Sequence, residues 1–211
     1  MVMGVPESGL PAAEGYARAS GIPMGRGLIK NRYIGRTFIA PNQRMRDLGV
    51  QMKLNPLVHN IEGRRLVVVD DSIVRGTTTL SMIRMLRRSG ATEIHLRVSS
   101  PPYRWPCFYG MDTGEQEKLL AHQRTVEDIA EHLEVDSLAY LSLDRLLAAT
   151  SAGMDDPGAG DLNGAGSGYC TACLTGDYPV PVDIGQSKHV LEATEPVGGV
   201  PEVEQLPLGA G

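Results

Sequence analysis

The run from Val67 to Thr79 combines an apolar strand, two adjacent carboxylates and a loop of small, hydroxyl-bearing residues. The open turn after Asp71 leaves backbone N–H groups available to a phosphate, and Thr77, Thr78 and Thr79 add hydroxyl donors. A helix that begins in this loop directs the positive end of its dipole to the same point. Asp70 and Asp71 repel phosphate, but they can accept hydrogen bonds from ribose hydroxyls or help to hold magnesium. The run therefore predicts a site for a ribose that carries a 5′-phosphate.

The same run has a simpler interpretation, an ordinary strand-to-helix turn with an acidic cap. Aspartate and threonine form such turns in many α/β proteins. A lone Asp-Asp pair favours the simpler interpretation, whereas the whole string of thirteen residues favours a ligand site.

The segment from Arg26 to Lys53 is strongly basic, although the net charge of the chain is −5. It holds seven Lys and Arg residues against a single acid, Asp47. Such a segment is either a solvated surface or, beside a phosphate loop, a clamp for a highly charged anion such as pyrophosphate. The acidic total argues against a general nucleic-acid binder, whose phosphate contacts require a basic surface.

The chain has three cysteines, Cys107, Cys170 and Cys173. An odd number, in a chain without a secretion signal, argues against a disulfide framework. The Cys-x-x-Cys spacing lets two thiolates reach one metal centre, and redox dithiols use the same spacing. No pair of histidines supplies matching local ligands, so the cysteines alone leave these alternatives open.

The elements that position these groups alternate between strands and helices. Hydrophobic patterning predicts strands at 2–5, 66–69, 93–98 and 138–141, and helices at 11–20, 78–88, 114–123, 125–133 and 143–149. Residues 23–49 are expected to form a long loop. The β-α-β order implies an α/β fold with a mostly parallel, twisted sheet and helices on both faces. Ligands bind such sheets at the carboxyl ends of the strands, where the Pro6–Gly9 turn and the Asp70 loop meet.

Length and composition predict one domain and a tail. Of 211 residues, 42% are hydrophobic, and no stretch approaches the roughly twenty apolar residues of a membrane span. Without a signal sequence the expected location is the cytoplasm. We expect an α/β domain at 1–150, a Gly-rich linker at 151–168, a Cys-x-x-Cys segment at 169–179 and a disordered tail at 180–211.

The Val67–Thr79 run resembles the phosphoribosyl pyrophosphate (PRPP) signature of type I phosphoribosyltransferases. Together with other motifs, in one order from residue 2 to about 179, it resembles the glutamine PRPP amidotransferase (amidophosphoribosyltransferase) family. These motifs are Val5-Pro6-Glu7-Ser8-Gly9, Gly27 to Ile39, Lys53-Leu54-Asn55-Pro56, Ser99-Ser100-Pro101-Pro102, Pro106 to Gly110, Asp136 to Leu143 and Cys170 to Pro179.

The resemblance implies a type I phosphoribosyltransferase fold in which ammonia attacks C1 of PRPP. The products are 5-phosphoribosylamine and pyrophosphate, in the first committed step of purine (IMP) synthesis. By motif position, Ser8, Asp70 and Asp71 surround Mg²⁺, although Ser8 can equally be an ordinary helix N-cap. The resemblance assigns the 5′-phosphate cradle to Ser72, Ile73, Val74, Arg75, Gly76, Thr77, Thr78 and Thr79. It assigns Lys30, Tyr33 and Arg36 to a mobile catalytic loop that closes over pyrophosphate.

In the same family, Cys107, Cys170 and Cys173 match three of the four thiolate ligands of a 4Fe-4S cluster. The fourth is expected upstream of Met1, so we do not expect this chain to hold the cluster stably. Family members begin with a glutaminase domain whose N-terminal cysteine releases ammonia from glutamine. The chain is therefore expected to be a C-terminal fragment with truncated first strands, dependent on free ammonia. The resemblance further implies purine nucleotides as inhibitors and a homotetramer at full length, with no nucleic-acid or membrane partner.

Two alternatives stay open. The first is a non-catalytic remnant that at most binds PRPP or nucleotides, because a missing sheet edge would leave backbone groups unpaired. The second is a purine-salvage phosphoribosyltransferase that uses a base in place of ammonia, which the Cys107 and Cys170 motifs disfavour.

Overall fold

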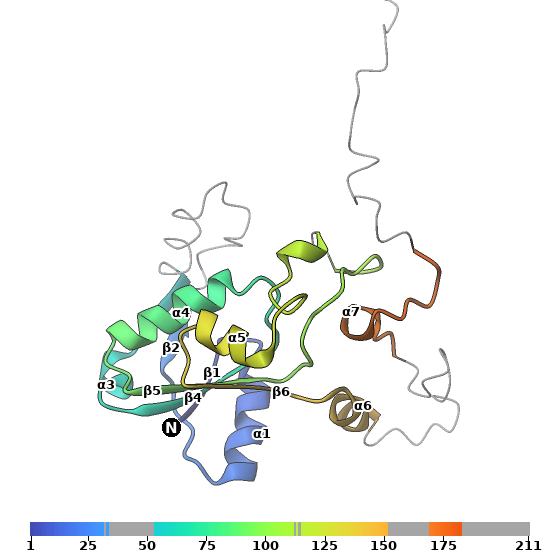
Figure 1. The fold of residues 1–211 in the computed structure, drawn as a ribbon. Helices are drawn as coiled ribbons and strands as arrows, with labels where there is room; N and C mark the ends of the chain where they lie inside the picture. Colours follow the sequence, from blue (N-terminus) through green and yellow to red (C-terminus); the bar gives the residue numbers. More distant parts are fainter. Residues whose placement is uncertain (32, 34–52, 112, 114, 152–168, 183–211) are drawn as a thin grey trace, which may run out of the picture. The chain divides into compact units, whose positions relative to one another are not determined.

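The main sheet has four parallel strands in the order β1-β4-β5-β6 (Figure 1). They are β1 (Val2–Gly4), β4 (Arg65–Asp70), β5 (Glu93–Val98) and β6 (Ser137–Tyr140). The computed structural model describes residues 1–31, 33, 53–111, 113, 115–151 and 169–182. Residues 1–181 form one unit. The predicted α/β class and parallel sheet are confirmed.

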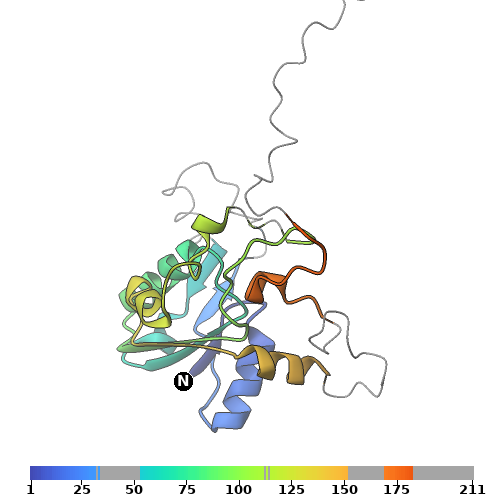
Figure 2. The ribbon, with the colours of Figure 1, turned by 45° about the vertical axis from the view of Figure 1, so that its right-hand side comes forward.

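Helices cover both faces of this sheet, as the sequence predicts. In Figures 1 and 2, α4 and α5 lie on one face and α1 lies on the opposite face. The described helices are α1 (Leu10–Ser20), α3 (Val58–Ile61), α4 (Thr77–Arg88), α5 (Val126–His132), α6 (Leu143–Ser151), α7 (Ala172–Thr175) and the 3₁₀ helix η1 (Gln116–Lys118).

Two apolar clusters lie on the two sides of β4, because alternate strand residues point to opposite faces. Leu66 and Val68 pack in the larger cluster with Ile83 of α4. Val69 packs in the smaller cluster with Ala13 of α1. The Asp70 loop that follows β4 is therefore attached to a strand that is buried on both faces.

The outer edge of β1 is paired rather than open. The amide of Val2 donates to the carbonyl oxygen of Pro23 at 2.9 Å, and the amide of Gly25 donates to the carbonyl oxygen of Val2 at 2.9 Å. These bonds pair both the N–H and the C=O of Val2, which is fully buried.

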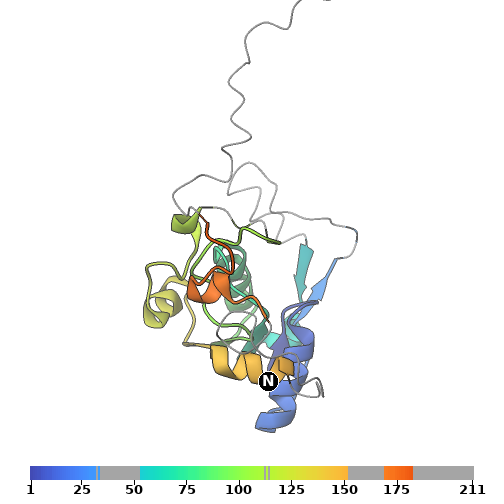
Figure 3. The same cartoon turned by 90° about the vertical axis from the view of Figure 1, so that its right-hand side faces the viewer.

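Part of the predicted long loop at 23–49 is instead a strand. β2 (Leu28–Lys30) pairs antiparallel with β3 (Leu54–Pro56), and the two form a separate ribbon beside the main sheet (Figure 3). Leu28 and Leu54 are buried in the larger apolar cluster. The two strands lie about 25 residues apart in sequence, so the short-range pattern of hydrophobic residues does not indicate that they pair. Residues 34–52 lie outside the described residues.

The predicted helix at 114–123 is wrong, since only η1 forms there. Leu119, Leu120 and Ala121 are all buried, and one face of a helix cannot bury three consecutive residues. The predicted helix at 125–133 is confirmed as α5. Its capping box joins Thr125 and Asp128.

The predicted boundaries beyond residue 150 are only partly open to comparison. α6 continues to Ser151, and the rest of the predicted linker, 152–168, lies outside the described residues, as does 183–211 of the predicted tail. The Cys-x-x-Cys segment forms the short helix α7. Among the helices described, none is both long enough and apolar enough to span a bilayer.

Candidate functional site

The turn after β1 and the loop after β4 meet at one edge of the sheet. The amide of Val5 donates to the carbonyl oxygen of Val69 at 2.8 Å. A Cβ at Gly9 would lie 2.4 Å from that same oxygen, so the turn can approach the end of β4 only with glycine there. The bond between Pro6 and Glu7 is a cis peptide. This packing brings the first turn against the two aspartates.

Ser8 lies beside the second aspartate. Its hydroxyl donates to Oδ1 of Asp71 at 3.0 Å. The N-cap interpretation of Ser8 is wrong, because Gly9 occupies the N-cap of α1 and no side chain caps that helix. Ser8, Asp70 and Asp71 are therefore together at one edge, as the sequence places them.

The two aspartates have different environments. Asp70 is 8% exposed, whereas Asp71 is exposed. The amide of Asp71 donates to Oδ1 of Asp70 at 3.0 Å. Burial, and then the neighbouring Asp71 carboxylate, raise the pKa of Asp70 to about 7. The pair thus presents one solvated carboxylate and one buried carboxyl group that is close to its titration point at neutral pH.

The loop after the aspartates has the backbone geometry of an anion site. Gly76 has φ +75° and forms the N-cap of α4, which has no side-chain cap. Within the described part of the chain, the amides of residues 73–78 have no hydrogen-bond acceptor. These donors lie at the positive end of a twelve-residue helix.

The side chains of this loop divide into two sets. Thr77 and Thr78 are exposed, so their hydroxyls are available to a ligand. Ile73 and Thr79 are buried at 2% and 6% exposure, so their side chains face the core rather than solvent. The sequence prediction assigned all of these residues to the phosphate cradle without distinction. In the structure, only the backbone of Ile73 is available to an anion.

Of the three residues predicted for the catalytic loop, Lys30 contacts the turn at this edge. Its Nζ is 3.9 Å from Oε2 of Glu7, in the turn that carries Ser8. Tyr33 is completely exposed. Arg36 lies outside the described residues.

The cysteines lie on two segments that are joined by backbone hydrogen bonds. The amides of Arg104 and Trp105 each donate to the carbonyl oxygen of Cys173 at 3.1 Å, which fixes α7 against the segment before Cys107. The sulfur of Cys107 accepts hydrogen bonds from the amides of Gly110 and Met111, at 3.5 and 3.4 Å. Such N–H donors stabilise a thiolate and are typical of cluster-binding cysteines.

The thiol of Cys173 is half-buried, whereas that of Cys170 is not. Burial raises the pKa of Cys173, and the Cys107 and Cys170 thiols raise it further, whereas a hydrogen bond with Tyr103 opposes them. Cys170 is exposed. The structure therefore holds the Cys-x-x-Cys segment beside the segment that carries Cys107.

Neither the two aspartates at the sheet edge nor the three cysteines form a complete metal site by themselves. Among the residues described, there is no set of three or more His, Cys, Asp or Glu side chains that could hold a metal ion.

Sequence reasoning missed the residues that support the cysteines. Thr113 is a buried polar residue whose hydroxyl accepts from the Cys107 amide at 2.7 Å and from the Tyr103 hydroxyl at 3.4 Å. Tyr178 donates to the carbonyl oxygen of Pro106 at 2.6 Å. Nothing in the spacing of these residues indicates the contacts, and that of Tyr178 joins segments 72 residues apart.

Comparisons with known proteins agree with this geometry. Residues 1–101 match the family model described as the phosphoribosyl transferase domain. The chain is 53% identical over 194 residues to the amidophosphoribosyltransferase of Synechocystis, and 49% identical over 182 residues to that of Bacillus subtilis. These alignments cover 91% and 86% of the chain but 37% of each relative, so the chain spans little more than a third of their length.

Solved structures give the same result. The glutamine PRPP amidotransferase of B. subtilis, in complex with ADP and GMP, superposes with a TM-score of 0.70 at 50% identity. It covers 84% of this chain, which in turn covers 37% of that structure. A second structure, described as the allosteric regulatory enzyme of purine biosynthesis, gives a TM-score of 0.69 at 49% identity.

Proposed function

Because this chain is a homologue of the phosphoribosyltransferase part of amidophosphoribosyltransferases, we propose that it transfers the phosphoribosyl group of PRPP to ammonia. The products are 5-phosphoribosylamine and pyrophosphate. One observation carries the proposal: two carboxylates lie directly beside a loop of unbonded amides at the start of α4.

The loop binds the 5′-phosphate of PRPP. The amides of residues 73–78 and the hydroxyls of Thr77 and Thr78 donate to the phosphate oxygens. The carboxylates of Asp70 and Asp71 accept hydrogen bonds from the ribose hydroxyls. This arrangement fixes the ring so that C1 faces the nucleophile.

Magnesium fits the residues at the edge of the sheet. Asp70, Asp71 and the Ser8 hydroxyl, which lie together there, would hold the ion through hard oxygen ligands. When bound, the ion stabilises the negative charge of the departing pyrophosphate.

Lys30 adds positive charge at the same edge. In the proposed reaction its ammonium group exchanges its contact with Glu7 for one with the pyrophosphate oxygens. Tyr33 and Arg36 remain sequence-based proposals for the same anion. Exclusion of water matters here, because an oxocarbenium-like centre at C1 is open to hydrolysis.

Cys107, Cys170 and Cys173 are proposed as thiolate ligands of an iron–sulfur cluster. The amide donors to the Cys107 sulfur, and the backbone hydrogen bonds that hold Cys173 beside the segment before Cys107, support this assignment. A 4Fe-4S cluster takes four thiolates and this sequence supplies three. After anaerobic reconstitution we therefore expect fewer than about four iron atoms to remain per chain; a stable, fully loaded preparation would contradict this expectation.

Purine nucleotides are proposed as inhibitors, because the related B. subtilis structure is described in complex with ADP and GMP. Inhibition of pyrophosphate release by GMP, and its absence with CMP, is the expected result.

Pyrophosphate release tests the proposed activity. The purified chain is mixed with PRPP, Mg²⁺ and ammonium, and compared with Asp70→Asn and with Asp144→Asn, a matched control at an exposed position in α6. We expect release with the wild type and Asp144→Asn, and little with Asp70→Asn. Release that stays at the Asp70→Asn level in all three would refute catalysis by this chain.

The two alternatives give different results in the same assay. Turnover that requires hypoxanthine or guanine in place of ammonium would indicate a purine-salvage enzyme. A melting temperature raised by PRPP and Mg²⁺, without turnover, would indicate a protein that only binds PRPP.

A further inference from the structure

The side of the Asp70 loop that faces the core is held by Leu120. The amide of Leu120 donates to the carbonyl oxygen of Val74 at 2.8 Å. A Cβ at Gly76 would lie 2.6 Å from Cδ2 of Leu120, so this side chain packs directly on the backbone of Gly76. Leu120 is 7% exposed and shares the larger apolar cluster with Ile73. It thus contacts the loop through both its backbone and its side chain.

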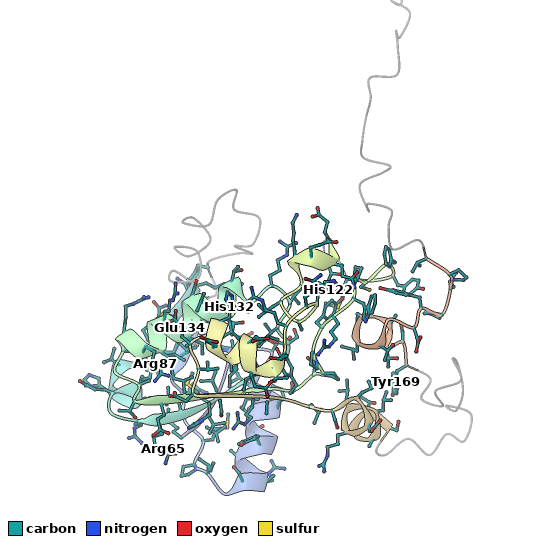
Figure 4. The ribbon with its side chains drawn as sticks, viewed as in Figure 1. Arg65, Arg87, His122, His132, Glu134 and Tyr169 are labelled. Atoms are coloured by element: carbon teal, nitrogen blue, oxygen red, sulfur yellow. The ribbon has the colours of Figure 1, made fainter. Side chains whose placement is uncertain are left out.

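Leu120 is itself fixed by a segment that is anchored elsewhere. Its neighbours Leu119 and Ala121 are buried, and the amide of His122 donates to the carbonyl oxygen of Leu119 at 3.1 Å. The ring of His122 packs edge-to-face against Trp105, with ring centroids 6.3 Å apart. Figure 4 shows His122 on this segment, between η1 and α5.

Leu120 contacts the same short loop that carries the proposed phosphate donors. The amides of residues 73–78 have no acceptor in the described chain. The direction of these N–H groups therefore depends on the contacts that hold the rest of the loop. The left-handed conformation of Gly76 leaves this backbone without a Cβ to limit its freedom. The packing of Leu120 against the loop therefore restrains this backbone.

We propose that Leu120 is a positioning residue for the 5′-phosphate, which holds the loop amides in place before the substrate arrives. The inference rests on the proposed function and adds a residue that touches neither substrate nor metal. Loss of this packing leaves the loop to be ordered when phosphate binds, and the ordering cost weakens affinity. The carboxylates and cations that take part in the chemical step are unchanged when this packing is lost.

Calorimetric titration of the full chain with ribose 5-phosphate tests the proposal without requiring turnover. The variants are Leu120→Ala, the conservative Leu120→Met and the matched control Leu119→Ala. Leu119 has the same volume and is buried to a similar degree (3% exposed), and it makes no backbone hydrogen bond to the loop. Melting temperatures of all proteins separate a local effect from general destabilisation.

We expect Leu120→Ala to raise the Kd for ribose 5-phosphate about tenfold, which is ~1.4 kcal/mol. Leu119→Ala is expected to stay within about twofold of the wild type despite a similar fall in melting temperature. Leu120→Met, which keeps the volume, is expected to recover most of the affinity. In turnover, Leu120→Ala raises the KM for PRPP and leaves kcat nearly unchanged.

The outcomes separate the two claims. If the wild type does not bind ribose 5-phosphate, the proposed function fails and the inference fails with it. If the wild type binds and both alanine variants lose affinity equally, or neither does, only the role of Leu120 is overturned. If Leu120→Ala does not fold, Leu120→Val replaces it, and an affinity equal to that of the wild type overturns the proposal.

Discussion

Replacement of Gly76 by alanine probes the loop where conformation and packing act together. The residue has φ +75°, a region that costs an L-residue about 1–2 kcal/mol. The added Cβ would also lie 2.6 Å from Cδ2 of Leu120, a contact that forces the neighbour to move. Overpacking of this kind typically costs about 1–3 kcal/mol. Gly76→Ala should therefore lower the free energy of unfolding by about 2–5 kcal/mol in total.

Gly63 supplies a matched control. Its φ is +68°, almost the same, but a Cβ there would have no atom within 4 Å. Gly63→Ala should thus show the conformational cost alone, about 1–2 kcal/mol. The difference between the two variants isolates the contact with Leu120.

Urea denaturation measures both variants, with the free energy of unfolding obtained by linear extrapolation. The double variant Gly76→Ala with Leu120→Ala should be less destabilised than the sum of its single variants, because the shortened side chain makes room for the new methyl group. Equal losses in Gly76→Ala and Gly63→Ala, or strict additivity in the double variant, would refute the reasoning.

Three further predictions concern stability and binding away from Gly76. Burial raises the pKa of Asp136, but hydrogen bonds from a backbone amide of β5 and from Arg87 outweigh it, so the pKa is lowered from 3.8. Asp136→Asn should therefore cost about 1 kcal/mol in urea unfolding at pH 7. The gap should begin to narrow as the pH falls below about 4 and should close only at the lower pH at which the folded wild type is protonated; a gap that is independent of pH contradicts this. Thr125→Ala removes a capping box and should cost about 1 kcal/mol in the same assay, and an unchanged midpoint would count against it. Ser8→Ala removes the hydroxyl bonded to Asp71 and should weaken Mg²⁺-dependent PRPP binding severalfold in calorimetry, whereas unaltered affinity would remove Ser8 from the site.

The main sheet was predictable because its strands and helices carry their signals locally. The alternation from Glu93 to Val98 matches β5 residue by residue. The Gly21 that ends α1 and the Thr125 that begins α5 are single-residue signals with a direct structural cause. The carboxylates of Asp70 and Asp71 were found for the same reason, since they follow a continuous apolar strand.

Features that depend on distant contacts could not be read in this way. β2 and β3 pair across a long insertion, and the buried triplet that begins at Leu119 adopts the conformation that the Asp70 loop requires. Thr113 was interpreted as the start of a helix, yet its hydroxyl serves the Cys107 amide. In each case tertiary packing overrides local preference, which is also why the role of Leu120 becomes visible only in the structure.

The central claim is that the loop after Asp71 binds the 5′-phosphate of PRPP. The most direct measurement is an amide NMR titration of the ¹⁵N-labelled chain with ribose 5-phosphate. The claim predicts that the largest shifts fall on the amides of residues 73–78, with saturation at one ligand per chain. Shifts that gather elsewhere, or none at millimolar ligand, would contradict it.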